Sequence, residues 1–128
     1  MRKMLLVFVL LATSFAGSSY ALTIGFSVAR FDDNFLTVMR NDAVRHAGEM
    51  GYTMQVDDAK DDVTTQLSQV QNYIASGVDA IIVNAVDTDT TQAMTKAAEN
   101  AGVPLVYVNR QPIDLDALGA STTFVGSN

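Results

Sequence analysis

The sequence predicts an α/β fold with an open, mostly parallel, doubly wound sheet. Gly51, Gly77 and Gly102 each close a helical pattern and open a strand pattern, at spacings of 26 and 25 residues. These spacings match one strand-plus-helix unit, and a glycine after a helix accommodates the left-handed backbone that ends it. Residues 81–83 and 105–108 are nearly continuous apolar runs, which are typical of parallel strands covered on both faces.

The first residues are typical of an export signal and not of the folded domain that follows. Two basic residues precede a short apolar run at 4–11, and a Ser-Tyr-Ala triplet that ends at Ala21 fits a small-x-small cleavage pattern. The apolar run is shorter than a bilayer-spanning helix needs. We therefore predict a signal peptide over residues 1–21, cleaved near Ala21, and a folded domain over residues 22–128.

The first strand and helix are predicted over residues 23–28 and 34–50. The strand is mostly apolar, whereas the helix carries apolar residues at three- and four-residue spacing, which forms one stripe. Asp33 lies directly before the helix and is a favoured residue type for an N-cap. The stripe consists of Phe35, Leu36, Met39, Ala43, Ala47 and Met50.

The remaining elements repeat this alternation. Helices are predicted over residues 62–76 and 88–100, with apolar stripes of Val63, Leu67, Val70 and Ile74, and of Ala93, Met94, Ala97 and Ala98. Strands are predicted over residues 52–57, 80–84, 105–109 and 122–126, the last after a loop at 111–121. Because a fifth parallel strand should be followed by a covering helix, we expect the sheet to be incomplete at its C-terminus and the chain to be a fragment.

The composition excludes several classes of function. The chain has 14 acidic and 8 basic residues, a formal net charge of −6, which becomes −8 once the two basic residues of the leader are removed. Such a domain repels nucleic acid, so no nucleic-acid partner is predicted. The chain has no cysteine, one histidine and no glycine-rich phosphate motif, so we predict no metal, no cofactor and no enzymatic activity.

Polar side chains follow the predicted strands at the points where the strands end. Parallel strands bring these ends to one rim, where open α/β sheets bind ligands. Carboxylates, amides and a guanidinium pair with hydroxyl groups, and a phenyl ring can cover an apolar ring face. We therefore predict a site for a neutral polyhydroxy ligand. Its candidate residues are Arg30, Asp33 and Phe35 after the first strand, Asn84 after the third, Asn109 and Arg110 after the fourth, and Ser127 after the fifth.

Simpler interpretations of these residues stay open. Polar residues at strand ends are frequently turn residues or helix caps, and Phe35 begins an apolar stripe and would then belong to the core. His46 is expected to be a solvated surface residue, since it has no acidic or thiol partner nearby in sequence. Capping or solvation is the preferred interpretation for the remaining acidic residues at the rim, Asp57, Asp58, Asp61, Asp62 and Asp87.

Three motifs in this order resemble the periplasmic sugar-binding proteins of ABC importers, in their ribose- and galactose-binding branch. They are Phe-Asp-Asp-Asn-Phe at 31–35, Val-Asn-Ala-Val-Asp at 83–87 and Val-Asn-Arg-Gln at 108–111. The resemblance implies that residues 22–128 form the amino-terminal lobe of a two-lobed, monomeric receptor in the periplasm. Such a receptor closes on a monosaccharide or cyclitol and delivers it to an ABC permease in the inner membrane.

The resemblance also implies roles for individual residues. Asp33 matches the carboxylate or amide that binds sugar hydroxyls in the family, and Phe35 matches the aromatic residue that covers a ring face. Asn84 matches an amide after the third strand. Asn109 and Arg110 match the pair after the fourth strand, where the ribose branch usually has Asp before Arg.

Other positions bear on the identity of the ligand. Ser127 matches a small polar contact after the fifth strand, and Arg30 sits where the galactose branch has a basic residue. Leu36 stands where the ribose branch often has a second aromatic residue, which disfavours ribose. The stretch Asp-Asp-Asn-Phe-Leu at 32–36 also resembles the corresponding sequence of inositol- and rhizopine-type binding proteins.

Two other families are alternatives. A response-regulator receiver domain also has an acidic pair after its first strand, here Asp32 and Asp33. Its third strand, however, should end in a phosphorylated Asp where this chain has Asn84, and its fourth should end in a hydroxyl residue where Asn109 stands. The effector domain of a lactose-repressor-type transcription factor should follow a basic helix-turn-helix, whereas this chain begins with an export signal.

Overall fold

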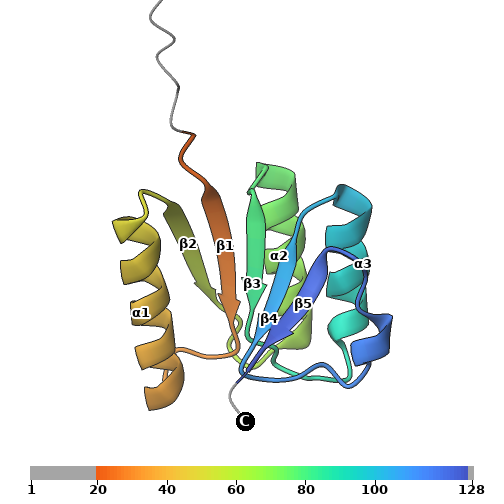
Figure 1. Ribbon diagram of the computed structural model, residues 1–128. Coiled ribbons are helices and arrows are strands. Elements are labelled where there is room, and N and C mark those ends of the chain that lie inside the picture. The colour runs from red at the N-terminus through yellow and green to blue at the C-terminus, as the bar shows by residue number, and fades with distance from the viewer. Residues whose placement is uncertain (1–19, 127–128) are drawn as a thin grey trace, which may run out of the picture.

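The computed structural model describes residues 20–126, which form a five-stranded parallel sheet with helices on both faces (Figure 1). The strand order is β2-β1-β3-β4-β5, and each neighbouring pair is parallel. The predicted α/β class with a doubly wound parallel sheet is thereby confirmed. The elements are β1 (Thr23–Val28), α1 (Asn34–Glu49), β2 (Thr53–Asp58), α2 (Val63–Ser76), β3 (Ala80–Val83), α3 (Thr91–Ala101), β4 (Leu105–Val108), the 3-10 turn η1 (Leu115–Ala117) and β5 (Thr122–Val125).

The observed bounds differ from the predicted ones most at the start of α3. The helix begins at Thr91 rather than at residue 88, because residues 87–90 form a turn. In this turn the Asp89 backbone N–H donates to Asp87 Oδ1 over 2.9 Å, and Thr90 Oγ1 donates to the Asp87 carbonyl over 3.2 Å. Aspartate side chains compete with the helix in this way by bonding to nearby backbone.

The predicted cap of α1 is confirmed, and Asp62, for which capping or solvation is the preferred interpretation, caps α2. Asp33 Oδ1 accepts a hydrogen bond from the Leu36 backbone N–H over 2.8 Å, and Asp62 Oδ1 accepts one from that of Thr65. The hydrogen bonds from Thr65 hold the pKa of Asp62 below its usual value. Each carboxylate therefore satisfies a backbone donor that the first turn of a helix leaves without a partner.

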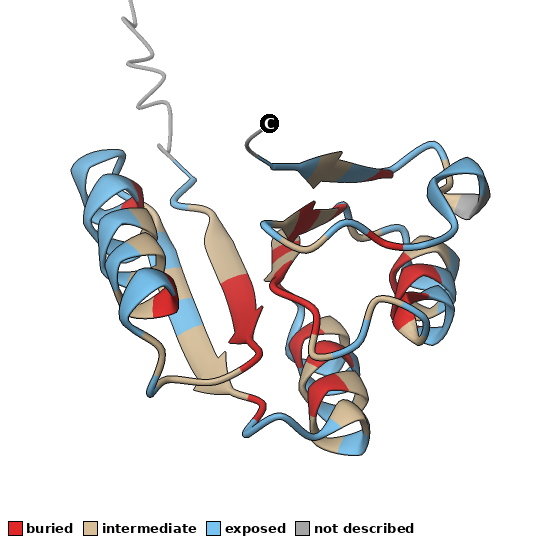
Figure 2. Cartoon of the chain, turned by 90° about the horizontal axis from the view of Figure 1, so that it is seen from below, coloured by how far each residue is buried: buried red, intermediate tan, exposed pale blue. Residues whose placement is uncertain are grey.

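The two faces of the sheet carry two separate cores. On one face α2 and α3 pack against β3 and β4, and on the other α1 packs against β1 and β2 (Figures 1 and 2). The residues of the first core include Val70, Tyr73, Ile81, Val83, Met94, Leu105 and Tyr107, and those of the second are Phe26, Val28, Ala29 and Leu36. Within residues 20–126, no helix has the length and hydropathy that crossing a bilayer requires.

Two predictions of burial on the helices are wrong. Phe35, in the first turn of α1, and Met50, at its C-cap, are 59% and 63% exposed, whereas Leu36 and Ala47 in the first and last turns are buried, so the buried face of the helix passes beside the two predicted residues. On α3, Ala93 is exposed and Thr95 is buried instead.

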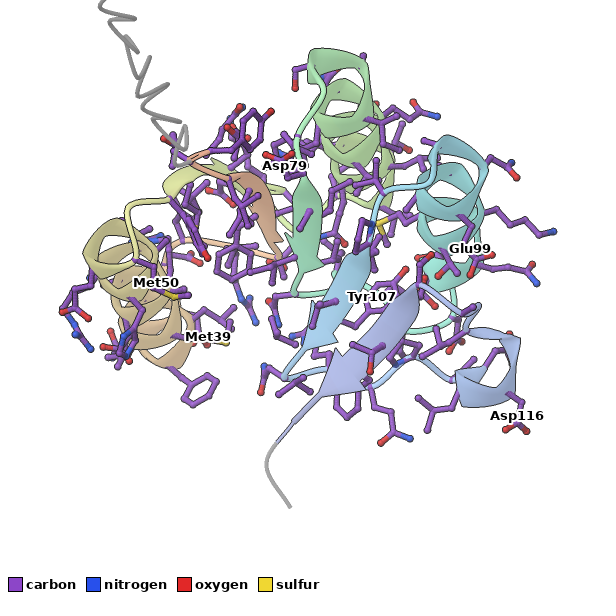
Figure 3. The ribbon with its side chains drawn as sticks, turned by 45° about the horizontal axis from the view of Figure 1, so that its top comes forward. Met39, Met50, Asp79, Glu99, Tyr107 and Asp116 are labelled. Carbon is purple, nitrogen blue, oxygen red and sulfur yellow. The ribbon has the colours of Figure 1, made fainter. Side chains whose placement is uncertain are left out.

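The burial of Thr95 has a specific cause in Tyr107 of β4, which points toward α3 (Figure 3). The Tyr107 hydroxyl donates to the Thr91 carbonyl over 2.8 Å and accepts from Thr95 Oγ1 over 2.9 Å. Burial raises the pKa of Tyr107 to about 12, so the phenol keeps its proton at neutral pH. A hydroxyl with such partners can be buried at little cost.

Gly25 of β1 allows the close approach of α2 to the sheet. A Cβ atom at this position would lie 2.4 Å from Cγ of Tyr73. We expect Gly25→Ala to lower the free energy of unfolding by about 1–3 kcal/mol, because a packed core does not yield without strain. Urea denaturation followed by circular dichroism measures this change.

Gly48→Ala is the matched control for this substitution. Gly48 lies on α1, and a Cβ there would meet nothing within 4 Å. This variant should be unchanged or more stable by about 0.5–1 kcal/mol, since alanine favours a helix over glycine. Equal urea midpoints for Gly25→Ala and Gly48→Ala would contradict the packing argument.

Candidate functional site

The carboxyl ends of all five strands lie at one edge of the sheet, at the bottom of Figure 1. Six of the seven predicted site residues lie in or beside the loops that leave this edge, and Ser127 lies outside the described residues, as does most of the predicted signal peptide. Arg30, Asp33 and Phe35 follow β1, Asn84 follows β3, and Asn109 and Arg110 follow β4. The topology therefore gathers them as predicted, but their surroundings differ.

Phe35 lies on the first turn of α1 with its side chain exposed, so the interpretation that it belongs to the core is wrong. It lines a hollow of about 300 Å³ that α1 shares with the ends of β4 and β5. A volume of about 300 Å³ is at the lower end of small-molecule sites. The other residues around this hollow are Met39, Val108, Asn109, Val125 and Gly126.

Asp33, just before Phe35, is half-buried and uses Oδ1 to cap α1. A carboxylate has two oxygens and can accept several hydrogen bonds. The cap therefore fixes the carboxyl group in place while Oδ2 retains the capacity to accept a bond from a ligand hydroxyl. Direct ligand contact by Asp33 stays a prediction.

Asn109 closes β4 with a left-handed backbone, at φ +67°. Asparagine tolerates this conformation better than most residues, because its short polar side chain bonds locally. The Asn109 backbone N–H donates to the Val125 carbonyl over 3.0 Å, which ties the turn to β5. The side chain itself is exposed at the wall of the hollow. An amide in this position can both donate to and accept from a hydroxyl group.

Arg110 is half-buried and tied to the loop after β3. Its Nη1 donates to the Ala85 carbonyl over 3.1 Å and to the Val86 carbonyl over 2.8 Å. A guanidinium has five N–H donors in a planar fork. These two bonds use Nη1 alone, so the protein fixes one arm of the fork while donors on Nε and Nη2 remain for other acceptors.

Asn84 is completely buried, and its amide is paired on both sides. Its Oδ1 accepts from the Ala29 backbone N–H, and its Nδ2 donates to the Val108 carbonyl, each over 3.3 Å. The side chain thus joins the ends of β1, β3 and β4. This arrangement fits a structural link better than direct ligand contact, and contact between Asn84 and a ligand stays a prediction.

Sequence reasoning missed Gln66, a residue of α2 that is only 1% exposed. Its Oε1 accepts from the Val86 backbone N–H over 2.8 Å, and its Nε2 donates to the Asn84 carbonyl over 3.0 Å. The spacing of residues 66, 70 and 73 places Gln66 on the buried face of the helix. Its polar side chain conceals that signal, because the buried face of an amphipathic helix is recognised by its apolar residues.

Arg30 lies apart from the other predicted residues. Its Nη1 forms an exposed ion pair with Asp61 Oδ2 at 3.2 Å, and such pairs contribute little stability. It lines a second hollow of about 490 Å³, which shares no lining residue with the Phe35 hollow. The other residues of this second hollow are Phe31, Asp32, Asp58, Lys60 and Asp61. The structure therefore does not bring Arg30 together with Phe35 and Asn109.

The link through Asn84 makes a prediction about stability. Asn84→Ala removes both amide bonds, which leaves the Ala29 N–H without this partner and the Val108 carbonyl with only its bond from the Arg110 N–H. We expect a loss of about 1–3 kcal/mol in the free energy of unfolding, the usual cost of a buried donor left unpaired, here the Ala29 N–H. Asn72→Ala on the exposed face of α2 is the control and should be nearly neutral. Unchanged stability of Asn84→Ala would contradict the structural link.

Comparisons with known proteins agree with this fold. The family described as periplasmic binding protein domain matches residues 24–128. A protein of Rhizobium meliloti that is assigned to rhizopine binding is 52% identical over 112 residues, which cover 87% of this chain and 36% of that protein. The ribose import binding protein of Bacillus subtilis is 30% identical over 95 residues, which cover 74% of this chain and 31% of that protein.

Solved structures show the same likeness. The crystal structure of an ABC transporter solute binding protein from Bacillus halodurans with bound myo-inositol superposes with a TM-score of 0.76 and 36% sequence identity. The match covers 88% of this chain and 38% of that one. The chain thus spans about a third of the length of the relatives it matches.

Proposed function

The chain belongs to the periplasmic binding protein domain family, and from this we propose that it is the amino-terminal, sugar-binding lobe of the periplasmic receptor of an ABC importer. The observation that carries the proposal is the hollow at the carboxyl edge of the sheet, where the exposed Phe35 ring and the Asn109 amide share one concavity. Arg110 follows Asn109 directly, with one arm of its guanidinium fixed.

A monosaccharide or cyclitol fits the chemistry of this rim. An aromatic face packs against the C–H groups of a sugar ring, while amide, carboxylate and guanidinium groups pair with its hydroxyls. Within this class we favour an inositol-like ligand. The support is the 52% identity to a protein assigned to rhizopine binding and the 36% identity to a protein solved with myo-inositol.

The full-length protein would contain a second lobe that closes over the ligand. The relatives are about three times as long as the matched region, and this chain supplies only one open wall of a site. Closure would remove water, which strengthens hydrogen bonds between protein and ligand. The ligand is then bound without chemical change and passed to an inner-membrane permease by a monomeric receptor. The family match favours this function over a receiver domain or a repressor effector domain.

A binding panel tests the proposed function. The full-length protein is titrated by calorimetry with myo-inositol, ribose, galactose and glucose. We expect saturable one-to-one binding of at least one of them, with a higher affinity for myo-inositol than for ribose. The ligand should be recovered unchanged, as judged by NMR. No binding across the panel, or conversion of the bound compound, would contradict the proposal.

Arg110 should contribute strongly to this affinity. Arg110→Ala removes a guanidinium whose remaining donors would be paired and desolvated in the closed receptor, a change that costs roughly 2–5 kcal/mol of binding energy. Arg110→Lys should not restore binding, because an ammonium lacks the planar fork. Arg45→Ala is the control, since Arg45 is an exposed residue of α1 that pairs with Asp42 and Glu49. Wild-type affinity in Arg110→Ala would place Arg110 outside the site.

A further inference from the structure

We infer that Gln66 is a positioning residue for ligand binding: from inside the fold it sets the loop to which the Arg110 guanidinium is tied. This inference rests on the proposed function, because it assigns Gln66 a part in the affinity of the same site. Gln66 itself is almost completely buried on α2 and cannot touch a ligand at the rim. Any effect on affinity therefore passes through other residues.

The first step of the argument is the contact between Gln66 and the loop. One primary amide bonds to both ends of a three-residue segment, Asn84 to Val86: it accepts from the Val86 N–H and donates to the Asn84 carbonyl. This segment lies beyond the end of β3 and before α3. Its first residue still bonds to β1, since the Asn84 N–H donates to the Ser27 carbonyl over 2.9 Å, but no ladder or helix bond defines the peptide between Ala85 and Val86. The side chain of Gln66 there supplies the hydrogen bonds that a neighbouring strand supplies within the sheet.

The second step is the contact between this loop and Arg110. Nη1 of Arg110 donates to the carbonyls of Ala85 and Val86, which belong to the same segment. Gln66 and Arg110 thus hold different polar groups of one short stretch of backbone. The Val86 N–H that Gln66 holds and the Ala85 carbonyl that Arg110 holds belong to the same peptide group. If this peptide rotates, the Ala85 acceptor of Nη1 moves, and the arm of the guanidinium that orients its remaining donors is no longer fixed at two points.

The third step concerns the orientation of Gln66 itself. Its Nε2 also donates to Ser27 Oγ over 3.1 Å, and Ser27 Oγ in turn donates to Gln69 Oε1 over 2.7 Å. Gln69 Nε2 then donates to the Asp58 carbonyl over 2.8 Å. Since the Val86 N–H can only donate and the Asn84 carbonyl can only accept, the network permits one orientation of the Gln66 amide.

Gln66→Glu is the most informative substitution. It preserves the size of the side chain and an acceptor for the Val86 N–H, but it removes both donor bonds and sets a carboxylate oxygen against the Asn84 carbonyl. In the full-length protein we expect it to weaken binding of myo-inositol at least about fivefold, the range seen when coupled residues are separated. Gln66→Met, which is apolar and of similar length, should act in the same direction.

Gln71→Glu provides the matched control. Gln71 lies on the exposed face of the same helix, so this variant carries the same change in charge and should bind as the wild type does. In an Arg110→Ala background, Gln66→Glu should weaken binding further by less than about twofold, because its effect acts through Arg110. An equal loss in both backgrounds would show that Gln66 acts on the fold in general, and would overturn the inference.

A second readout needs no ligand. The bonds from Nη1 to two carbonyls hinder rotation of the guanidinium, so its N–H signals should be resolved in nitrogen-15 NMR spectra of the wild type and of Gln71→Glu, and broadened or shifted in Gln66→Glu. Failure of the wild type to bind any compound of the panel would refute the proposed function, while these spectra would still decide the positioning role. Unchanged Arg110 signals in Gln66→Glu, or loss of the fold in both Gln66 variants, would overturn the inference.

Discussion

The rim depends on buried amide groups that hold backbone where no regular secondary structure does. Asn84 joins the ends of β1, β3 and β4, and Gln66 pairs with the segment that follows β3. Each of these amides would be costly to bury without partners, and each has a partner for both its oxygen and its nitrogen. The loops at the carboxyl edge therefore have defined positions before any ligand arrives, which reduces the cost of ordering them on binding.

The apolar cores supply the platform for this arrangement. Gly25 lets Tyr73 lie directly against β1, and the same helix carries Gln66 into the space below the loop. On the opposite face α1 packs near β1 and β2, and its first turn presents Phe35 outward at the rim. The packing of the helices on the sheet and the geometry of the rim are thus coupled, because the distance between a helix and the sheet decides which loop groups its polar side chains can reach.

The sequence predicted the sheet, the caps of α1 and α2 and the rim because these depend on periodicity and on residue type at element ends. Asp33 and Asp62 cap their helices as expected, and the candidate residues of the described chain gather at one edge. The sequence did not predict that the Asn84 amide is hydrogen-bonded to backbone groups or that Gln66 is buried. Those facts depend on contacts such as that between Gln66 and Val86, which are 20 residues apart in the chain, and no local pattern encodes such a pairing.

The cap at Asp33 has a consequence for the evolution of ligand preference. Its place before α1 restricts the position to residues that satisfy the first turn of a helix, and asparagine and aspartate do so about equally well. A change between the two replaces a pure acceptor by a group that can also donate, yet it leaves the helix start intact. Under the proposed function, selection could therefore exchange the hydrogen-bonding character of this position without a penalty in folding, and Asp33 would be a position at which ligand preference diversifies.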